Sequence, residues 1–220
     1  MLQIFLKLAR PVVWGFARLY FRIRFHGVEH VPRTGPLLLL ANHVSYADPV
    51  LVTIPIRRPI HYLAWKRLFH VPLLGPLIRW LRAFPINIDE PDPQAVRTVI
   101  RLLKAGEAVL IFPEGSRSAD GRVQPLQRGA IRLALRLGVP VCLVSIAGAF
   151  EAWPLTRRFP RPGRVRVTYY PPFTPSLKGE AEDPAEAIRG LAQEIQEKLQ
   201  KGLEFLRAAA LVIPSGVSLV

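Results

Sequence analysis

Apolar residues along this chain follow two patterns, short continuous runs and longer segments with helical spacing. Short runs bounded by Gly, Pro or charged residues are typical of strands buried on both faces, and alternation is typical of a strand nearer the edge of a sheet. Seven segments are predicted to be strands, of which the last one alternates: 22–26, 37–41, 60–64, 84–88, 108–112, 141–146 and 164–170.

Segments with apolar positions three and four residues apart lie between these runs. Asp followed by Pro opens three of them, at Asp48, Asp92 and Asp183, and resembles an N-cap followed by Pro in the first helical turn. Gly106 and Gly138 mark the ends of two helices, and 68–81 is predicted to be helical in part. The alternation predicts an α/β fold with a mixed, largely parallel sheet flanked by helices.

The first 22 residues have the pattern of a basic amphipathic helix. One face carries Phe5, Leu8, Val12, Phe16 and Leu19, and the opposite face carries Lys7, Arg10, Arg18 and Arg22. Such a helix is typical of one that lies in the headgroup layer of an anionic membrane, although a helix packed on the domain with its arginines in water has the same pattern. Pro11 is expected to kink or restart it.

Three regions follow from these patterns. Residues 1–22 are predicted to be a membrane-associating segment, 23–207 an α/β domain, and 208–220 an apolar tail whose role the sequence leaves open. Uncharged runs are shorter than the roughly 18 residues that a membrane span needs. A cleavable signal peptide is not expected, because arginines recur through the region where it would be apolar. We therefore predict a monotopic protein on the cytoplasmic face of a membrane.

The charge balance narrows the class of partner. Thirty Lys and Arg against 16 Asp and Glu give a net charge of +14, which favours a nucleic acid, an anionic membrane or an acidic substrate. The arginines are interleaved with long apolar side chains and no nucleic-acid motif is present, so no nucleic acid is expected. The single Cys142 lies in an apolar run and predicts a buried thiol. The histidines form no cluster with Cys or carboxylates, so no metal is expected.

Two polar clusters directly follow predicted strands. His43 and Asp48 follow 37–41, and Glu114, Gly115 and Arg117 follow 108–112. Ligand sites in α/β sheets lie at the carboxyl ends of strands. A carboxylate bonded to Nδ1 of an imidazole leaves Nε2 free to take a proton from a hydroxyl, which is the task of a general base. The alternatives are a structural histidine and an aspartate that caps a helix.

On these motifs the chain resembles the glycerolipid acyltransferase family, which includes 1-acyl-sn-glycerol-3-phosphate acyltransferase (lysophosphatidic acid acyltransferase). The resemblance extends over about 25–173 and consists of four blocks in the family's order: Asn42–Pro49, Lys66–Ile88, Phe112–Ser118 and Gly138–Val141. It implies transfer of an acyl chain from acyl-carrier protein or coenzyme A to the sn-2 hydroxyl of 1-acyl-sn-glycerol 3-phosphate. The product is phosphatidic acid, and no cofactor is required besides the acyl-thioester donor.

The resemblance also implies a role for each motif residue. His43 is expected to be the general base and Asp48 to orient it, without an acyl-enzyme intermediate. Lys66 and Arg117 are expected to bind the acceptor phosphate, while Glu114 and Gly115 shape the glycerol site. Lys66 could instead be an ordinary surface lysine. Glu114 could pair with Arg117 and hold the loop, a role compatible with substrate contact.

One departure from the family pattern keeps the acceptor open. Ile88 stands where the family often has an arginine, so a phosphate contact is missing or comes from another residue. The first alternative function is therefore acylation of a different lysophospholipid. A second, from another class, is a non-catalytic basic protein that binds membrane or nucleic acid.

Overall fold

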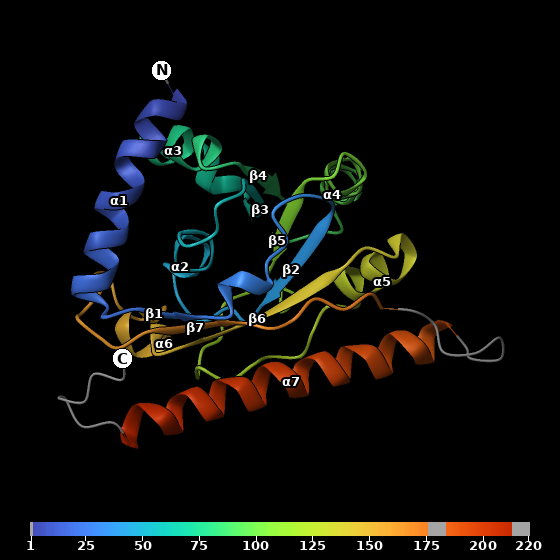
Figure 1. The fold of residues 1–220 in the computed structure, drawn as a ribbon. Helices are drawn as coiled ribbons and strands as arrows, with labels where there is room; N and C mark the ends of the chain where they lie inside the picture. The colour runs from blue at the N-terminus through green and yellow to red at the C-terminus, as the bar shows by residue number, and fades with distance from the viewer. Residues whose placement is uncertain (1, 176–183, 213–220) are drawn as a thin grey trace.

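A computed structural model describes residues 2–175 and 184–212, and within these ranges seven strands form one sheet in the order β1-β7-β6-β2-β5-β3-β4 (Figure 1). The strands are β1 (Arg24–His26), β2 (Leu37–Ala41), β3 (Ile60–Trp65), β4 (Ala83–Ile86), β5 (Ala108–Ile111), β6 (Val141–Ala147) and β7 (Arg166–Tyr169). Neighbouring strands run parallel except β6 and β7, which are antiparallel. The predicted mixed, largely parallel sheet is confirmed.

Helices cover both faces of the sheet. They are α1 (Leu2–Tyr20), α2 (Asp48–Thr53), α3 (Leu74–Trp80), α4 (Pro93–Lys104), α5 (Arg128–Leu137), α6 (Ala149–Ala152) and α7 (Pro184–Val212), with 3-10 turns η1 (Val28–His30) and η2 (Lys66–His70). Figure 1 shows α7 running beneath the sheet, on the opposite side from α1 and α2.

The central strand β2 explains why its sequence has no polar alternation. Leu37 and Leu39 pack into the core under α1 and α2, whereas Leu38 and Leu40 pack into the core under α4, α5 and α7. All four side chains are fully buried. Complete burial of one such side chain contributes about 1.5–3 kcal/mol, so a strand covered on both faces is apolar at every position.

Two of the expected helix boundaries have the predicted chemistry. The carboxylate of Asp92 accepts hydrogen bonds from the amides of Gln94 (3.0 Å) and Ala95 (2.9 Å) at the start of α4. Gly138 ends α5 with a left-handed φ of 57°. The expected cap at Asp183 lies outside the described residues, as do residues 213–220 of the expected tail, while α7 continues through Val212.

The strand expected over 84–88 ends two residues earlier than predicted. The amide of Asn87 donates to the carboxylate of Asp92 at 2.9 Å, so this amide turns toward the start of α4. Ile88 consequently lies after β4 in an exposed link. Pro85 is tolerated because β4 is an edge strand.

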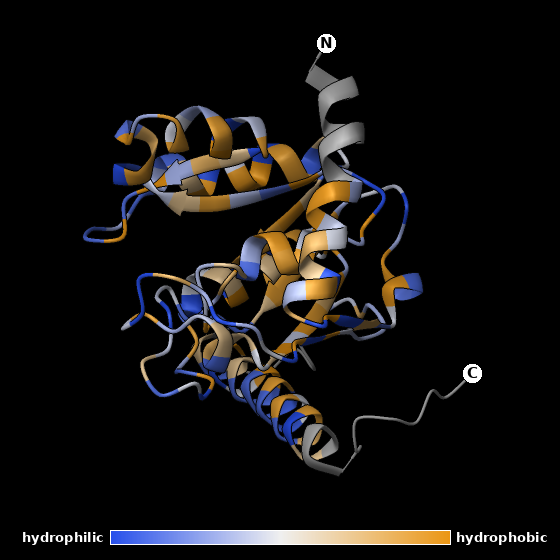
Figure 2. Cartoon of the chain, turned by 90° about the vertical axis from the view of Figure 1, so that its left-hand side faces the viewer, coloured by the Kyte–Doolittle hydropathy of each residue, from blue (hydrophilic) through white to orange (hydrophobic). Residues whose placement is uncertain are grey.

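The N-terminal segment forms one continuous helix, α1, with Pro11 inside it. Ala17 is buried against the domain, whereas Val12, Phe16 and Leu19 are exposed by 71%, 53% and 83%. Figure 2 views the molecule from this side and shows hydrophobic residues on the described turns of the helix. In the described ranges, no helix is both long and apolar enough to cross a membrane.

Candidate active site

The carboxyl end of β2 is fixed to its neighbour by Asn42. Its fully buried side chain donates from Nδ2 to the carbonyl of Ile146 (3.0 Å) and accepts from the amide of Ile146 (2.7 Å). Both groups belong to β6, which runs parallel to β2. The loop that begins at His43 therefore starts from a rigid position at the edge where parallel strands end.

His43 and Asp48 are in direct contact. Nδ1 of His43 lies 2.8 Å from Oδ2 of Asp48, and the same oxygen accepts from the amides of Val44 and Ser45, both at 2.7 Å. The Asp48 carboxylate is fully buried. Since a carboxylate only accepts, this geometry assigns the proton to Nδ1 and leaves Nε2 as an acceptor. The expected contact between the two side chains is present.

Asp48 does not cap the helix that it opens, contrary to the sequence prediction. The N-cap of α2 is Ala47, which makes no side-chain cap bond, and Asp48 is the first helical residue. Its side chain instead points back across the loop to three donors at positions 43, 44 and 45. The carboxylate thus organises the turn that presents His43.

The His43 ring packs on an aromatic side chain from the next strand. Phe112, directly after β5, stacks on it with ring centroids 4.0 Å apart and an angle of 18° between the planes. The His43 side chain stays 18% exposed, so part of it is open to solvent. The stacking and the Asp48 bond together restrict the ring to one orientation.

Glu114 joins the second cluster to the first. Its buried carboxylate accepts from the His43 amide (2.6 Å) and, through its other oxygen, from the Gln124 amide (2.7 Å). The amide of Ser118 donates to the carbonyl of His43 at 2.8 Å. The loop after β5 therefore binds both backbone groups of His43.

Arg117 does not pair with Glu114, which is the alternative that the sequence left open. Its guanidinium carbon lies 3.8 Å from the centroid of the Tyr46 ring, and Tyr46 is three residues after His43 in the same loop. Gly115 has a φ of +76°, a conformation that side chains rarely adopt, and an added Cβ would lie 3.2 Å from Cγ of Gln127. This φ allows a tight turn in which the Gly115 amide donates to the carbonyl of Phe112 at 3.1 Å.

Lys66 is more distant from this group. It follows β3, which is separated from β2 by β5, so it lies at the same sheet edge about 10 Å to the side. Its side chain is exposed. The pKa of Asp92 is lowered mainly by amide hydrogen bonds from Asn87 and Ala95, and also by the charge of Lys66.

Four contributing residues were not assigned a role from the sequence: Asn42, Tyr46, Phe112 and Gln124. Roles for Asn42 and Phe112 could have been predicted from the sequence, because each belongs to a motif directly after a predicted strand. The hydrogen bond from the Gln124 amide to Glu114 depends on how the loop folds, and no sequence pattern predicts it. Among the residues that the structure describes, no group of three His, Cys, Asp or Glu could hold a metal ion.

Glu114 should make the stability of the fold depend on pH. Burial raises its pKa from 4.5 to about 7, although the amide bonds from Gln124 and His43 oppose this. As pH rises from 4.5 to 7, the Glu114 carboxyl loses its proton in the unfolded state before it does so in the folded state. The unfolded state is thereby favoured, and the free energy of unfolding falls. The full effect is about 3 kcal/mol. In denaturant titrations, we expect the free energy of unfolding of the parent protein, relative to that of Glu114→Gln, to fall as pH rises through this interval.

The exposed Glu90 provides a matched control, because Glu90→Gln removes the same charge without a buried carboxylate. A difference between the parent and Glu114→Gln that stays constant from pH 4 to 8 would contradict the raised pKa. Glu114→Gln should also lose about 1–3 kcal/mol at any pH, since an amide cannot accept at both atoms.

Comparison with known proteins identifies the family. A model of the family described as Acyltransferase matches residues 22–147, more than half of the 220 residues. The chain belongs to the acyltransferase family. The matched span of this acyltransferase contains His43, Asp48, Lys66, Glu114 and Arg117.

Similar proteins include two curated relatives and one solved structure. A chloroplastic 1-acyl-sn-glycerol-3-phosphate acyltransferase of Brassica napus is 26% identical over 167 residues, covering 73% of this chain and 48% of that protein. The 1-acyl-sn-glycerol-3-phosphate acyltransferase of Bacillus subtilis is 31% identical over 127 residues, 57% of this chain and 63% of that protein. The acyltransferase thus spans about half to two-thirds of these relatives.

The crystal structure of the 1-acyl-sn-glycerophosphate (LPA) acyltransferase PlsC from Thermotoga maritima superposes with a TM-score of 0.69 at 26% identity. The superposition covers 92% of this chain and 83% of the PlsC chain. The likeness therefore extends beyond the span matched by the family model to most of the α/β fold.

Proposed function

We propose that this acyltransferase moves a fatty acyl chain from a coenzyme A or acyl-carrier-protein thioester to the sn-2 hydroxyl of 1-acyl-sn-glycerol 3-phosphate. The observation that carries the proposal is the 2.8 Å bond from Nδ1 of His43 to the buried carboxylate of Asp48, with the ring still partly open to solvent. Two similar proteins with names of this activity support the choice of acceptor.

The chemistry follows from the orientation of the ring. Nε2 of His43 takes the hydroxyl proton while the hydroxyl oxygen attacks the thioester carbonyl carbon. The carbon–sulfur bond then breaks, and the leaving thiolate takes the proton back from the imidazolium. Asp48 stabilises the imidazolium between these steps, as a buried carboxylate does in a nucleophile–base–acid arrangement. The steps balance without a cofactor or a metal.

Arg117 is the proposed anchor of the acceptor phosphate. Its guanidinium lies over the face of Tyr46, which fixes its plane and leaves N–H groups at its rim for a phosphate. Lys66 adds a second positive charge from the edge of the site, and the exposed Gly115 and buried Glu114 shape the glycerol position between them. Ile88 supplies no charge, so the proposed phosphate contacts come from Lys66 and Arg117.

The acceptor is a membrane lipid, and α1 is the proposed contact with the bilayer. Val12, Phe16 and Leu19 are the apolar side chains that it exposes, and the net charge of +14 suits anionic lipid. Residues 1–22 would hold the domain at the headgroup level of the cytoplasmic leaflet without crossing the bilayer.

The direct test is acyl transfer by the full chain in mixed micelles, with acyl-CoA and acyl-carrier protein as separate donors and a panel of lysophospholipids as acceptors. Formation of phosphatidic acid is the expected result. Transfer to another lysophospholipid alone would replace the acceptor and keep the chemistry. Failure of every donor and acceptor with folded protein would favour the non-catalytic binding protein.

Arg117→Gln should separate acceptor binding from chemistry. We expect KM for 1-acylglycerol 3-phosphate to rise about tenfold or more, because a hydrogen-bonded charge pair contributes about 1.5–3 kcal/mol. The effect on kcat should be smaller. Steady-state kinetics with monoacylglycerol, which lacks the phosphate, should show no such rise. Arg101→Gln on α4, an exposed arginine, is the matched charge control. An equal rise in KM for both acceptors would refute the phosphate role.

A further inference from the structure

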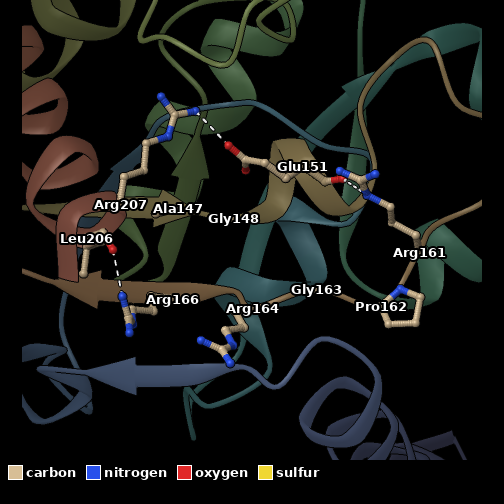
Figure 3. A pocket seen from close by; sticks show the side chains of 10 residues that line it. All are labelled: Ala147, Gly148, Glu151, Arg161, Pro162, Gly163, Arg164, Arg166, Leu206 and Arg207. Carbon is tan, nitrogen blue, oxygen red and sulfur yellow. Dashed lines mark hydrogen bonds and ion pairs between the residues drawn. The ribbon is translucent and has the colours of Figure 1, made fainter. Parts of the chain in front are cut away.

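A cavity of about 600 Å³ lies at the end of β6 and the start of β7 (Figure 3). It is bounded by the end of β6, the start of β7, the loop before β7 and the C-terminal part of α7. Four arginine side chains line it, namely Arg161, Arg164, Arg166 and Arg207. None of the acyltransferase motifs includes them.

Among the described residues that line this cavity, arginines outnumber carboxylates. Among its lining residues Glu151 is the one carboxylate, and its Oε1 lies 3.3 Å from Nη2 of Arg207. Arg24 adds a fifth guanidinium, because it stands opposite Arg166 in the pairing of β1 with β7. The pKa of Arg166 is lowered, first by burial and then by the charges of Arg24 and Arg164.

Several of these side chains are held in place by backbone groups. Arg166 donates from Nη1 to the carbonyl of Leu206 (2.8 Å), and Arg161 donates from Nε to the carbonyl of Glu151 (2.7 Å). Figure 3 shows Arg164 extending without such a bond. In the described chain its guanidinium has neither an acceptor nor a carboxylate partner. An anion with several oxygens would suit these forked donors.

The cavity lies at the same edge of the sheet as His43, because β6 runs parallel to β2. The end of β6 lies one strand from β2, and β7 and β1 follow, so the lateral separation is one to three strand spacings, about 5–15 Å. The ring of Trp153, at the end of α6, lies 5.4 Å from that of Tyr46. Arg207 donates to the carbonyl of Gly121, in the loop after β5 that also contains Glu114 (2.9 Å).

We propose that this cavity binds the phosphate groups at the nucleotide end of a coenzyme A thioester, the acyl donor. This inference depends on the proposed acyl transfer. A coenzyme A donor carries a diphosphate and a phosphomonoester at one end and the thioester at the other, joined by a flexible pantetheine chain. Phosphates bound among Arg24, Arg164 and Arg166 would leave that chain to cross the short distance along the sheet edge to His43. The acceptor phosphate, at Arg117, is a separate site.

Phosphate chemistry alone is shared by inorganic phosphate and by a lipid headgroup. The concave shape and the apolar lining of Ala147, Pro162 and Leu206 favour a ligand with a ring or chain attached over a free ion. The experiment must therefore compare adenosine 3′,5′-bisphosphate, inorganic phosphate and vesicles that contain phosphatidate.

Arg164→Gln is the decisive variant, because this side chain is exposed and lines the cavity. Calorimetric titration of the full chain with adenosine 3′,5′-bisphosphate should show binding that weakens about tenfold or more in the variant. KM for acyl-CoA should rise by a similar factor, while KM for an acyl-pantetheine thioester, which lacks the phosphates, stays the same. Arg97→Gln on α4 removes one exposed arginine elsewhere and should leave the nucleotide affinity unchanged.

Three other outcomes would overturn the proposal. Unchanged nucleotide affinity in Arg164→Gln would remove the cavity as the site. Inorganic phosphate that binds as tightly as the nucleotide would make it a free-ion site, and reduced binding to phosphatidate vesicles with unchanged nucleotide affinity would make it a headgroup site. The titration needs no turnover, so a wild-type protein that binds nucleotide at Arg164 but transfers no acyl group would refute the proposed function and not the cavity.

Discussion

His43→Ala should reduce kcat for acyl transfer by about a hundredfold or more. A positioned general base contributes roughly 10²–10⁴ to a rate, and this substitution leaves the acceptor hydroxyl without a group to take its proton. The fold should persist, because the His43 amide and carbonyl keep their bonds to Glu114 and Ser118. The measurement is single-turnover acyl transfer at saturating acceptor, beside thermal unfolding of the same preparation.

His26→Ala is the matched control, since His26 is an exposed histidine on β1. It should retain full turnover. If folded His43→Ala kept a tenth or more of the parent rate, His43 would not be the base, and the hydroxyl would have to be activated by another group. If Nε2 of His43 is the base, free imidazole should replace it in part. Added imidazole should then raise the residual rate of His43→Ala and leave the rate of His26→Ala unchanged.

The sequence was sufficient for the elements whose signals are local. The continuous run in β2 required burial on both faces, and Asp92 and Gly138 had the chemistry of helix ends. The pair His43 and Asp48 was also predictable, because four intervening residues allow a turn that returns the carboxylate to the ring.

Features that depend on distant partners were not predictable. Asp48 and Asp92 have the same Asp-Pro signature, yet only Asp92 caps its helix. Asp48 is instead the first residue inside its helix, and its Oδ2 accepts from amides of the preceding loop. Glu114 and Arg117 are three residues apart, but the Glu114 carboxylate binds the amides of His43 and Gln124 instead.

The arginine cavity was missed for the same reason. Its arginines come from the loop before β7, from β7 and from α7, so Arg164 and Arg207 share no motif. In the sequence they contributed only to the net charge of +14, which was assigned to a membrane surface. The fold gathers part of that charge in one cavity at the edge of the sheet where β2 and β6 end, and the net charge alone does not reveal where the arginines gather.

Asp48 should have the largest effect on stability of any single site residue. One oxygen, Oδ2, accepts three hydrogen bonds, from Nδ1 of His43 and the amides of Val44 and Ser45, in a fully buried position. Asp48→Ala would leave three donors without this acceptor, each costing about 1–3 kcal/mol. We expect the free energy of unfolding in urea to fall by about 3 kcal/mol or more, which is a large part of the usual 5–15 kcal/mol.

Asp48→Asn distinguishes the structural role from the catalytic one. Its amide oxygen can still accept from the loop, so the loss of stability should be smaller than in Asp48→Ala. The neutral side chain would stabilise the imidazolium poorly, and kcat should fall about tenfold to a hundredfold, less than in His43→Ala. Asp89→Asn, at a largely exposed carboxylate on the link after β4, should change neither quantity. Asn has nearly the same shape as Asp but carries no charge. Full turnover in Asp48→Asn would therefore mean that the carboxylate only shapes the loop.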